Sequence, residues 1–292
     1  MYELIQAGEN TFYIQSPAKI GVYRVSPNEV YLIDSGNDKD AGRRIRKILD
    51  EQGWTLRGIL NTHSNSDHIG GNAYLQSNTG CKVFSGGIEK VFTERTILEP
   101  SFLWGGFPCK ELRHKFLMAQ ESGAREFSDP DFPKEIEVIP LPGHFFDMAG
   151  FRTPDGVVFL ADCLSGRPTL EKYGITFIYD VAEYLKTLEK VKAMTAKMFV
   201  PSHADAAENI AELAQLNIDK VNEIAEKIVG ICAEPVSFEQ ILKRLFNEYG
   251  LKMTFEQHVL VGSTVRSYLS WLYDTDRLTA EFEDNIMLWR KI

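Results

Sequence analysis

The first half of the chain alternates short apolar segments with turn-forming residues, which is the pattern of neighbouring β-strands. Residues 11–15, 20–25 and 30–33 are rich in Val, Ile, Tyr and Phe, and Pro, Asn or Gly separates them. β-branched and aromatic residues favour strands, while Pro and Gly favour the turns that end them. The sequence therefore predicts that the protein begins with a β-sheet.

A second pattern joins strands to helices. Residues 40–52 place Ile45, Ile48 and Leu49 on one face, opposite Arg and Lys side chains, and this predicts an amphipathic helix. Further strands are predicted at 58–62, 82–84, 136–141, 151–153, 157–161 and 198–201, with helices at 72–77 and 181–194. An α/β domain built mostly from β-rich layers fits this alternation.

An insertion at about residues 86–131 interrupts the alternation. Helical patterns at 88–98 and 112–122 flank the aromatic stretch 102–108, and His114 lies in the second of them. Apolar residues flanked by Gly-Gly and Pro suit a mobile cover over a substrate pocket. They equally suit a contact with a second copy in a homodimer, or simple packing of the insertion onto the body of the protein.

The chain becomes helical after the last predicted strand. Residues 206–232 carry apolar positions at helical spacing, and Pro235 ends that run. Helical patterns continue at 237–249, 254–262 and 263–273, followed by an extended tail at 277–291. We therefore expect a boundary near residue 210, with a larger domain at 1–209 and a small helical domain at 210–292.

Composition narrows the class of protein and its partners. With 44% hydrophobic and 25% charged residues, the chain is typical of folded globular proteins. Its apolar runs are far shorter than the ~20 residues of a membrane span, and its first ten residues lack the pattern of a secretory signal. We expect a cytoplasmic protein with no membrane partner. The net charge of −9 makes nucleic acid an unlikely partner. The four cysteines lack C-x-x-C spacing and are expected to be buried thiols.

The residues with the most chemical content follow the ends of predicted strands. They are His63, Asp67 and His68 after the strand at 58–62, and His144, Asp162 and His203 after three later ones. Imidazole nitrogen and carboxylate oxygen bind zinc at ~2.0–2.2 Å. Each of these residues alone would be explained as a structural or surface residue. Four strand-end loops that each offer a metal-ligand type together predict a metal centre.

These motifs, in this order, resemble those of the metallo-β-lactamase-fold superfamily. The resemblance runs over about residues 10–205 and rests on Asp34-Ser35-Gly36, His63-x-Asn65-x-Asp67-His68, Gly143-His144, Asp162 and His203. It implies an α/β, four-layer αββα fold with a helical insertion. The C-terminal region resembles the winged-helix domain appended to some members. Its residues 211–292 hold nine basic and thirteen acidic side chains, which favours a packing or dimerisation module over a DNA-binding one.

The resemblance also implies a ligand set. His63 and His144 would hold one ion, Asp67, His68 and His203 a second, and Asp162 would bridge them, with Asp34 supporting the loop. The superfamily motif usually has a second His where this chain has Asn65, whose amide oxygen is a weaker, uncharged ligand. We therefore expect Asn65 to belong to a weaker site. One or two ions per chain are expected, with zinc as the first choice and iron or manganese compatible with ligands that are all N and O.

The function implied is hydrolysis by a metal-activated water, with Asp67 and Asp162 as catalytic residues that orient the water and relay its proton. The substrate class is a small ester, thioester or lactone whose apolar part meets Phe102, Trp104 and Phe107. Because this fold hosts many reactions, two alternatives stay open. One is a phosphodiesterase or nuclease, which the acidic C-terminal region counts against. The other is a ligand- or partner-binding protein without turnover, whose metal site has degraded at Asn65.

Overall fold

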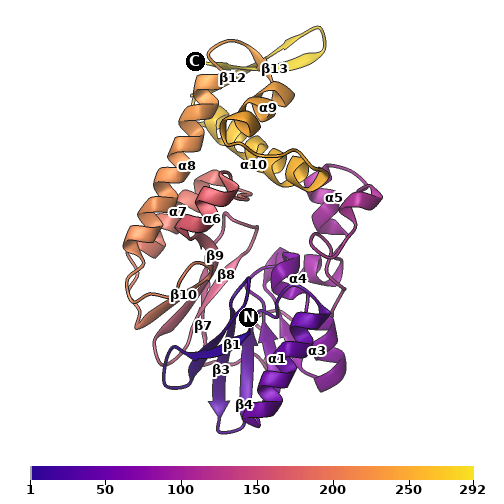
Figure 1. The fold of residues 1–292 in the computed structure, drawn as a ribbon, viewed down its shortest axis with the longest axis vertical. Coiled ribbons are helices and arrows are strands. Elements are labelled where there is room, and N and C mark those ends of the chain that lie inside the picture. The colour runs from indigo at the N-terminus through magenta and orange to yellow at the C-terminus, as the bar shows by residue number, and fades with distance from the viewer. Residues whose placement is uncertain (1) are drawn as a thin grey trace.

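The computed structural model describes residues 2–292, and it places two β-sheets face to face with helices on their outer sides (Figure 1). The first sheet has the order β1 (Glu3–Gln6), β2 (Thr11–Gln15), β3 (Ile20–Ser26), β4 (Glu29–Ile33), β5 (Thr55–Leu60) and β6 (Lys82–Phe84). The second has the order β10 (Met198–His203), β9 (Val157–Ser165), β8 (Ala149–Arg152) and β7 (Glu137–Pro140).

Helices connect the strands of both sheets. Those of the first half are α1 (Lys39–Gln52), α2 (Ser66–Ile69) and α3 (Asn72–Thr79), and the second sheet carries α6 (Arg167–Tyr173) and α7 (Val181–Lys192). The first of these shows why the local sequence forms a helix. The Asp38 side chain accepts a hydrogen bond from the Ala41 N–H, and Gly53 ends α1 in the left-handed conformation at φ 70°. Both are favoured residues at helix ends.

Three clusters of buried residues define the layers. Ile45 of α1 packs with Leu32 of β4 on the outer side of the first sheet. Phe84 of β6 and Phe151 of β8 belong to the cluster between the two sheets. Leu188 of α7 packs on the outer face of the second sheet. Together they give the αββα order, so the predicted four-layer fold is confirmed.

The insertion contains less helix than its sequence pattern predicts. The predicted helix at 88–98 is split into α4 (Gly87–Glu94) and α5 (Leu98–Trp104). The predicted helix at 112–122 is wrong, because only the short 3-10 turn η1 (Lys110–Leu112) is regular there, and His114 lies in an irregular segment. Leu112 and Leu117 pack against Val259 of the C-terminal region. Tertiary contacts therefore fix this segment in place of local helix propensity.

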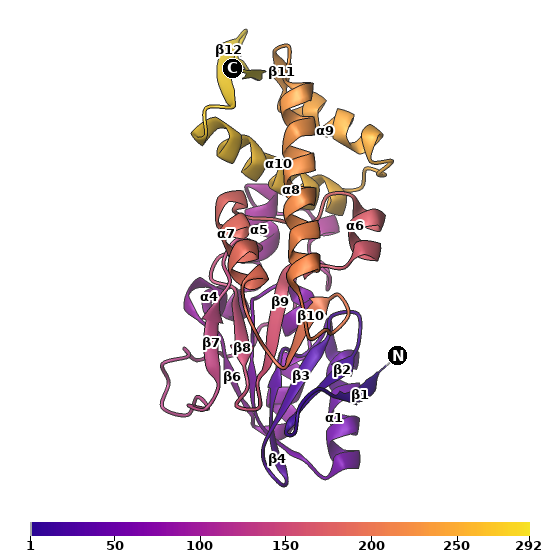
Figure 2. The ribbon, with the colours of Figure 1, turned by 90° about the vertical axis from the view of Figure 1, so that its left-hand side faces the viewer.

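The C-terminal region combines three helices with a small sheet (Figure 2). It consists of α8 (Ala211–Ile231), β11 (Val236–Ser237), α9 (Phe238–Glu248), α10 (Phe255–Asp274), β12 (Leu278–Glu283) and β13 (Ile286–Lys291), with the sheet order β11-β13-β12. The predicted break between residues 262 and 263 is wrong, since α10 is continuous there. The extended tail is a two-stranded hairpin. The likeness of this region to a winged helix stays a prediction.

The C-terminal region shares its core with the second sheet. One continuous cluster joins Leu160 of β9 and Tyr184 of α7 to Ile224 of α8 and to Val265 and Tyr268 of α10. The predicted boundary near residue 210 coincides with the start of α8, but no separate core marks it among the residues described. The division into two domains therefore stays a prediction.

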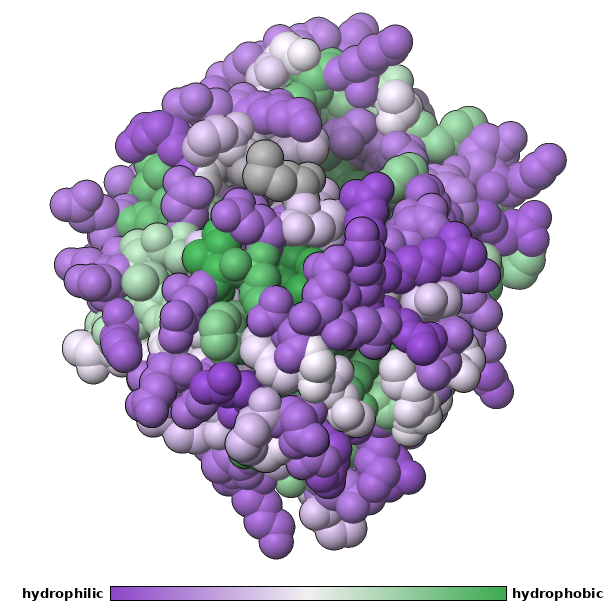
Figure 3. Space-filling model, turned by 60° about the horizontal axis from the view of Figure 1, so that its bottom comes forward, coloured by the Kyte–Doolittle hydropathy of each residue, from purple (hydrophilic) through white to green (hydrophobic). Residues whose placement is uncertain are grey.

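One face of the molecule is mostly polar. Hydrophilic side chains cover most of the face seen in Figure 3, and polar residues interrupt the hydrophobic areas on it. Within residues 2–292, none of the helices has the length and apolar character needed to cross a membrane. Cys81, Cys163 and Cys232 are buried thiols, as predicted, whereas Cys109 is half-buried.

Candidate metal centre

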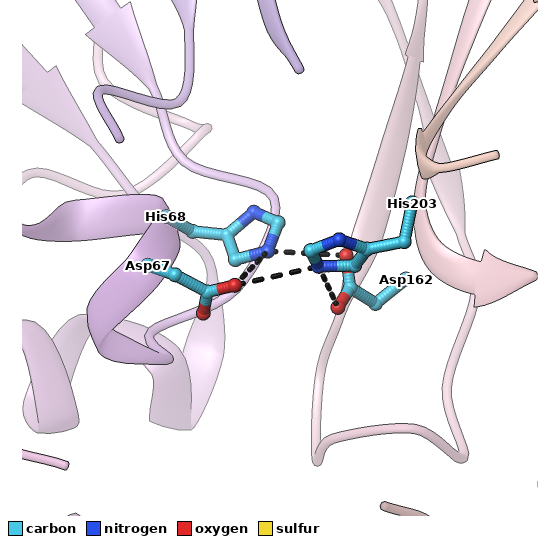
Figure 4. A group of neighbouring side chains, drawn as sticks. All are labelled: Asp67, His68, Asp162 and His203. Atoms are coloured by element: carbon cyan, nitrogen blue, oxygen red, sulfur yellow. Dashed lines mark ion pairs between the residues drawn. The ribbon is translucent and has the colours of Figure 1, made fainter. Parts of the chain in front are cut away.

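The predicted ligands meet at one edge of the two sheets and come from loops, a short helix and the strands themselves, because β9 runs on to Ser165 past the predicted strand end at residue 161. His63 lies in the loop after β5, Asp67 and His68 lie on α2, Asp162 lies on β9 and His203 ends β10. Figure 4 shows four of these side chains converging, two from α2 on one side and two from β9 and β10 on the other.

Short distances between side-chain atoms define this convergence. His68 Nε2 lies 3.0 Å from Asp162 Oδ1, and His203 Nε2 lies 3.1 Å from Asp162 Oδ2 and 3.3 Å from Asp67 Oδ2. His144 Nε2 lies 3.7 Å from Asp162 Oδ2. Asp162 is therefore the carboxylate that the other side chains surround.

The ligand-type atoms fall into two groups that share one residue. One group is Asp67, His68, Asp162 and His203, and the other is His63, His144 and Asp162, with the atoms of each group within 4.8 Å of one another. This is the partition that the family resemblance implies. The structure thus brings all six predicted His and Asp residues together, and Asn65 lies beside them.

Two residues in the left-handed region of φ lie next to the centre. Ala161 has φ 51° directly before Asp162, and Asp34 has φ 64°. The pairing of β9 with β10 shifts register at Pro201 and again before His203. Such irregularities re-aim side chains at the ends of strands, and they store backbone strain at functional sites. Asp162 therefore points to the centre, while its neighbour Cys163 is buried in the core on the helix side.

Each of the four histidines is held by its Nδ1 atom from outside the centre. His68 Nδ1 donates to Asp34 Oδ2 at 2.8 Å, His144 Nδ1 donates to the Phe177 carbonyl at 3.0 Å and His203 Nδ1 donates to the Pro17 carbonyl at 3.1 Å. His63 Nδ1 lies 3.0 Å from the hydroxyl of Thr62, whose own proton goes to Asp34 Oδ2. With Nδ1 protonated, the lone pair on each Nε2 faces inward, which is the arrangement of metal-binding histidines.

The charges and the burial of the centre shift the pKa values of its histidines. Burial and the neighbouring His68 lower the pKa of His63 well below its usual value. Burial acts in the same direction on His203, but Asp162 and Asp67 outweigh it and raise its pKa to about 10. The same two carboxylates overcome burial at His68 and raise its pKa well above its usual value. Asp67 and Asp162 therefore favour a positive charge beside them. Protons on the histidines or a metal ion can supply that charge, and a metal ion that binds displaces the protons.

Buried atoms that face the centre are left without partners among residues 2–292. They are His63 Nε2, His68 Nε2 and Asp162 Oδ1, since the close pair between the last two lacks hydrogen-bond geometry. An unpaired buried polar atom costs about 1–3 kcal/mol, and a divalent ion in each of the two ligand groups would satisfy these atoms. The residues present therefore fit a metal ion with N and O ligands.

Two buried glutamates of the insertion reach the same loops, and the sequence analysis did not identify either. Glu99 of α5, which is 5% exposed, accepts a hydrogen bond from Asn65 Nδ2 at 2.8 Å, while Asn65 Oδ1 lies 3.3 Å from His144 Nε2. Burial raises the pKa of Glu99 well above its usual range. Its location on a short helix gave no indication of this contact.

The other glutamate is Glu89 of α4, which is 1% exposed. One carboxyl oxygen accepts hydrogen bonds from the Ser64 backbone and hydroxyl, and the other accepts one from the Asp147 N–H. Glu89 therefore ties the loop that carries His63 to the loop that carries His144. The sequence did contain one indication, because Glu89 lies three residues before Phe92 on the apolar face of the predicted helix.

The aromatic residues predicted to meet the substrate are divided. Phe102 and Trp104 line a cavity of about 830 Å³ between α5, the start of α7 and α10, whereas Phe107 is 75% exposed and lies outside the lining. None of the predicted ligands lines this cavity. Phe102 is nevertheless close to the metal centre, with its ring 6.3 Å from that of Phe145, the residue after His144.

The two remaining histidines join the insertion to the C-terminal region. His114 Nε2 forms an ion pair with Glu256 Oε1 at 2.9 Å, and the His258 ring lies 6.2 Å from that of Trp104. His114 therefore contacts α10 and is no member of the ligand groups.

The sequence itself identifies the family to which the chain belongs. The sequence model of the metallo-beta-lactamase superfamily matches residues 16–203, which include every predicted ligand. The chain belongs to this superfamily.

Relatives in the superfamily carry several names. A beta-lactamase-like protein 2 homolog of Drosophila melanogaster is 25% identical over 201 residues, 68% of this chain and 62% of that protein. A hydroxyacylglutathione hydrolase of Rhodospirillum rubrum is 42% identical over 65 residues, 21% of this chain and 25% of that one. An atrochrysone carboxyl ACP thioesterase of Aspergillus fumigatus is 22% identical over 194 residues, 66% of this chain and 52% of that one. Each match spans less than two thirds of the relative.

Solved structures confirm the fold over nearly all of the chain. A beta-lactamase domain protein from Burkholderia ambifaria superimposes with a TM-score of 0.79 at 15% identity, covering 99% of this chain and 94% of that one. This metallo-beta-lactamase-fold neighbour therefore also covers the helical C-terminal region.

Proposed function

We propose that this superfamily member is a metal-dependent hydrolase that cleaves a thioester, with small esters and lactones as chemically related substrates. The observation that carries the proposal is the pair of ligand groups joined at Asp162, with the Nε2 atoms of four histidines turned toward them. A hydrolase of this class needs ligands fixed in this way by outer hydrogen bonds.

The residues divide into two sites. His63 and His144, with Asn65 beside them, would hold one ion, and Asp67, His68 and His203 would hold the other, with Asp162 shared. Zinc is the ion we propose, and iron and manganese are compatible with the same donors. Bound there, the metal supplies Lewis acidity toward water and toward the substrate carbonyl.

Two carboxylates are suited to handle the proton of the attacking water. The Asp67 side chain is 43% exposed, so water and substrate can reach it, while its Oδ2 is held 3.3 Å from His203 Nε2. The Asp162 side chain is only 11% exposed and is fixed between His68 and His203. We therefore assign Asp67 the role of orienting the water and accepting its proton, and Asp162 the role of fixing the geometry.

The choice of a thioester rests on the relatives. One is named a thioesterase and another a hydroxyacylglutathione hydrolase. In the substrates that these names describe, an acyl group is bonded to sulfur. The acidic C-terminal region counts against a phosphodiester in a nucleic acid, because such binding requires clustered positive charge.

The test combines metal content with turnover. Full-length protein purified without added metal is analysed for bound ions and assayed on thioester, lactone and phosphodiester substrates. We expect metal-stimulated thioester cleavage that falls at least ~100-fold in Asp67→Asn, consistent with the loss of a general base. The exposed Asp40→Asn serves as the matched control. Turnover of phosphodiesters alone would refute the substrate class. Absence of both metal and turnover would leave the binding-protein alternative.

A further inference from the structure

Asn65 occupies the position where the superfamily motif usually has a second histidine, and the structure gives it a partner from the insertion. We propose that Glu99 is a positioning residue that turns the Asn65 amide so that its oxygen acts as a ligand at the His63/His144 site. The inference rests on the proposed metal centre. It makes the insertion part of that centre, in addition to any role as a cover.

The two ends of the amide differ in what they can bind. Only Oδ1 has lone pairs for a cation, whereas Nδ2 carries two hydrogens and cannot serve as a ligand. Nδ2 donates to Glu99 Oε1 at 2.8 Å, so Oδ1 points the other way, to within 3.3 Å of His144 Nε2. A flipped amide would turn its N–H groups toward the metal centre, and its oxygen would receive no hydrogen bond from an ionised Glu99 carboxylate. Glu99 therefore selects the orientation that binds metal.

The position of Glu99 is itself fixed. Its helix α5 is anchored to the centre one turn further on, where the Phe102 ring lies 6.3 Å from that of Phe145 and 5.2 Å from that of Phe146. Both of these residues follow His144 directly in the chain. The helix α5 is therefore held against the loop that carries His144, whose Nε2 lies 3.3 Å from Asn65 Oδ1.

The hydrogen bond does not depend on the charge of Glu99. An ionised and a protonated carboxyl group both retain an oxygen that accepts from an amide N–H. A glutamine at position 99 retains one as well, whereas a methionine of similar length has none. Substitutions at position 99 can therefore separate the loss of an acceptor from the loss of charge.

The same argument changes how the departure at Asn65 is interpreted. A degraded site would have no need for a buried partner that orients the substituted residue. A weaker ligand held in one orientation instead gives a site that binds its ion less tightly than the Asp67/His68/His203 site and still fills at sufficient metal concentration.

The experiment measures binding of Zn²⁺ alone, with no substrate. Metal-free full-length protein is titrated in competition with a chromophoric chelator, and bound ions are counted by elemental analysis. We expect two ions in the unaltered protein. Glu99→Met should weaken the less tightly held ion about 10–100-fold, the usual cost of losing an outer partner, and leave the other unchanged. Glu99→Gln should stay close to the unaltered protein.

A double variant tests positioning directly. Asp at position 65 has an oxygen on both sides and needs no orientation, so Asn65→Asp in the Glu99→Met background should recover the weaker ion. A purely structural role for Glu99 predicts no recovery. Asn65→Leu removes the amide oxygen and should lose the same ion. This variant serves as the test if Glu99→Met does not fold. The exposed Glu111→Ala, in the same insertion, controls for a general loss of negative charge.

Three outcomes would overturn the inference. They are a single ion in the unaltered protein at saturating Zn²⁺, unaltered binding in Glu99→Met or Asn65→Leu, and failure of the double variant to recover the ion. These outcomes are independent of the proposed function. Thioester turnover with normal binding in Glu99→Met would sink the inference alone, whereas two ions without any hydrolysis would sink the function alone.

Discussion

Replacing Glu89 by glutamine should make the protein relatively more stable as the pH rises. Glu89 is fully enclosed, and burial raises the pKa of its carboxyl group to about 7 from 4.5, although hydrogen bonds from Ser64 and Asp147 oppose the shift. The substituted side chain has nearly the same shape but cannot ionise. The two proteins therefore differ mainly in the titration of one buried group.

The sign follows from proton linkage. Between pH 4.5 and about 7 the folded protein keeps the proton on Glu89, whereas the unfolded chain has released it. The unaltered protein therefore loses stability from this group as the pH rises through that interval, and the loss is complete above it. The difference between the pKa values of Glu89 in the unfolded and the folded chain corresponds to about 3 kcal/mol in the free energy of unfolding. The stability of Glu89→Gln relative to the unaltered protein should rise by about that amount.

Urea denaturation of both metal-free proteins at pH 4.5, 6 and 8 measures this difference, and contributions shared by the two proteins cancel. Glu111→Gln, at an exposed site in the same insertion, should show no such trend. A difference that stays constant with pH would refute the reasoning, because Glu89 would then titrate as in the unfolded chain. A difference that falls with rising pH would show that the two hydrogen-bonded loops stabilise the charged form.

Three further substitutions test the outer support of the centre and the core. Asp34→Asn keeps a residue that tolerates positive φ but removes the charge that holds His68 Nδ1, and should weaken metal binding about 10–100-fold in a chelator competition. Gly143→Ala, at φ 118° and with a Cβ 2.3 Å from the Tyr184 nitrogen, should cost at least ~2 kcal/mol in urea denaturation; an unchanged midpoint would contradict this steric argument. Leu188→Ala, at a fully buried site, should cost about 2–5 kcal/mol by the same assay, and a loss below ~1 kcal/mol would show that the site collapses around the smaller side chain.

Much of the site was predictable because it depends on local features. Alternating apolar residues and turn formers locate the strands, and His144, Asp162 and His203 stand at or near strand ends where two sheets converge. The family resemblance that rests on these motifs then implied the pairing of ligands, which matches the two groups sharing Asp162 in the structure. Strand ends can be recognised in sequence because turn chemistry is local.

What could not be predicted depends on contacts between distant segments. Glu99 lies 34 residues from Asn65, and Glu89 lies 25 residues from Ser64. A glutamate is ordinarily a surface residue, so only the folded chain shows that these two are buried. The irregular segment after η1 was mispredicted for the same reason. Its periodic pattern predicts a helix, but packing against α10 overrides that pattern.

Since Tyr184 of α7 and Tyr268 of α10 pack in one core, the C-terminal segment cannot be exchanged between relatives as a finished module. A chimaera joined at position 210 would combine core residues from two different proteins. The volumes of the side chains on the two sides of the join would not match unless both sides were redesigned. In the history of the superfamily, substitutions on the two sides of this join are expected to be accepted in compensating pairs. A library that varies both sides together should therefore yield more folded proteins than one that varies either side alone.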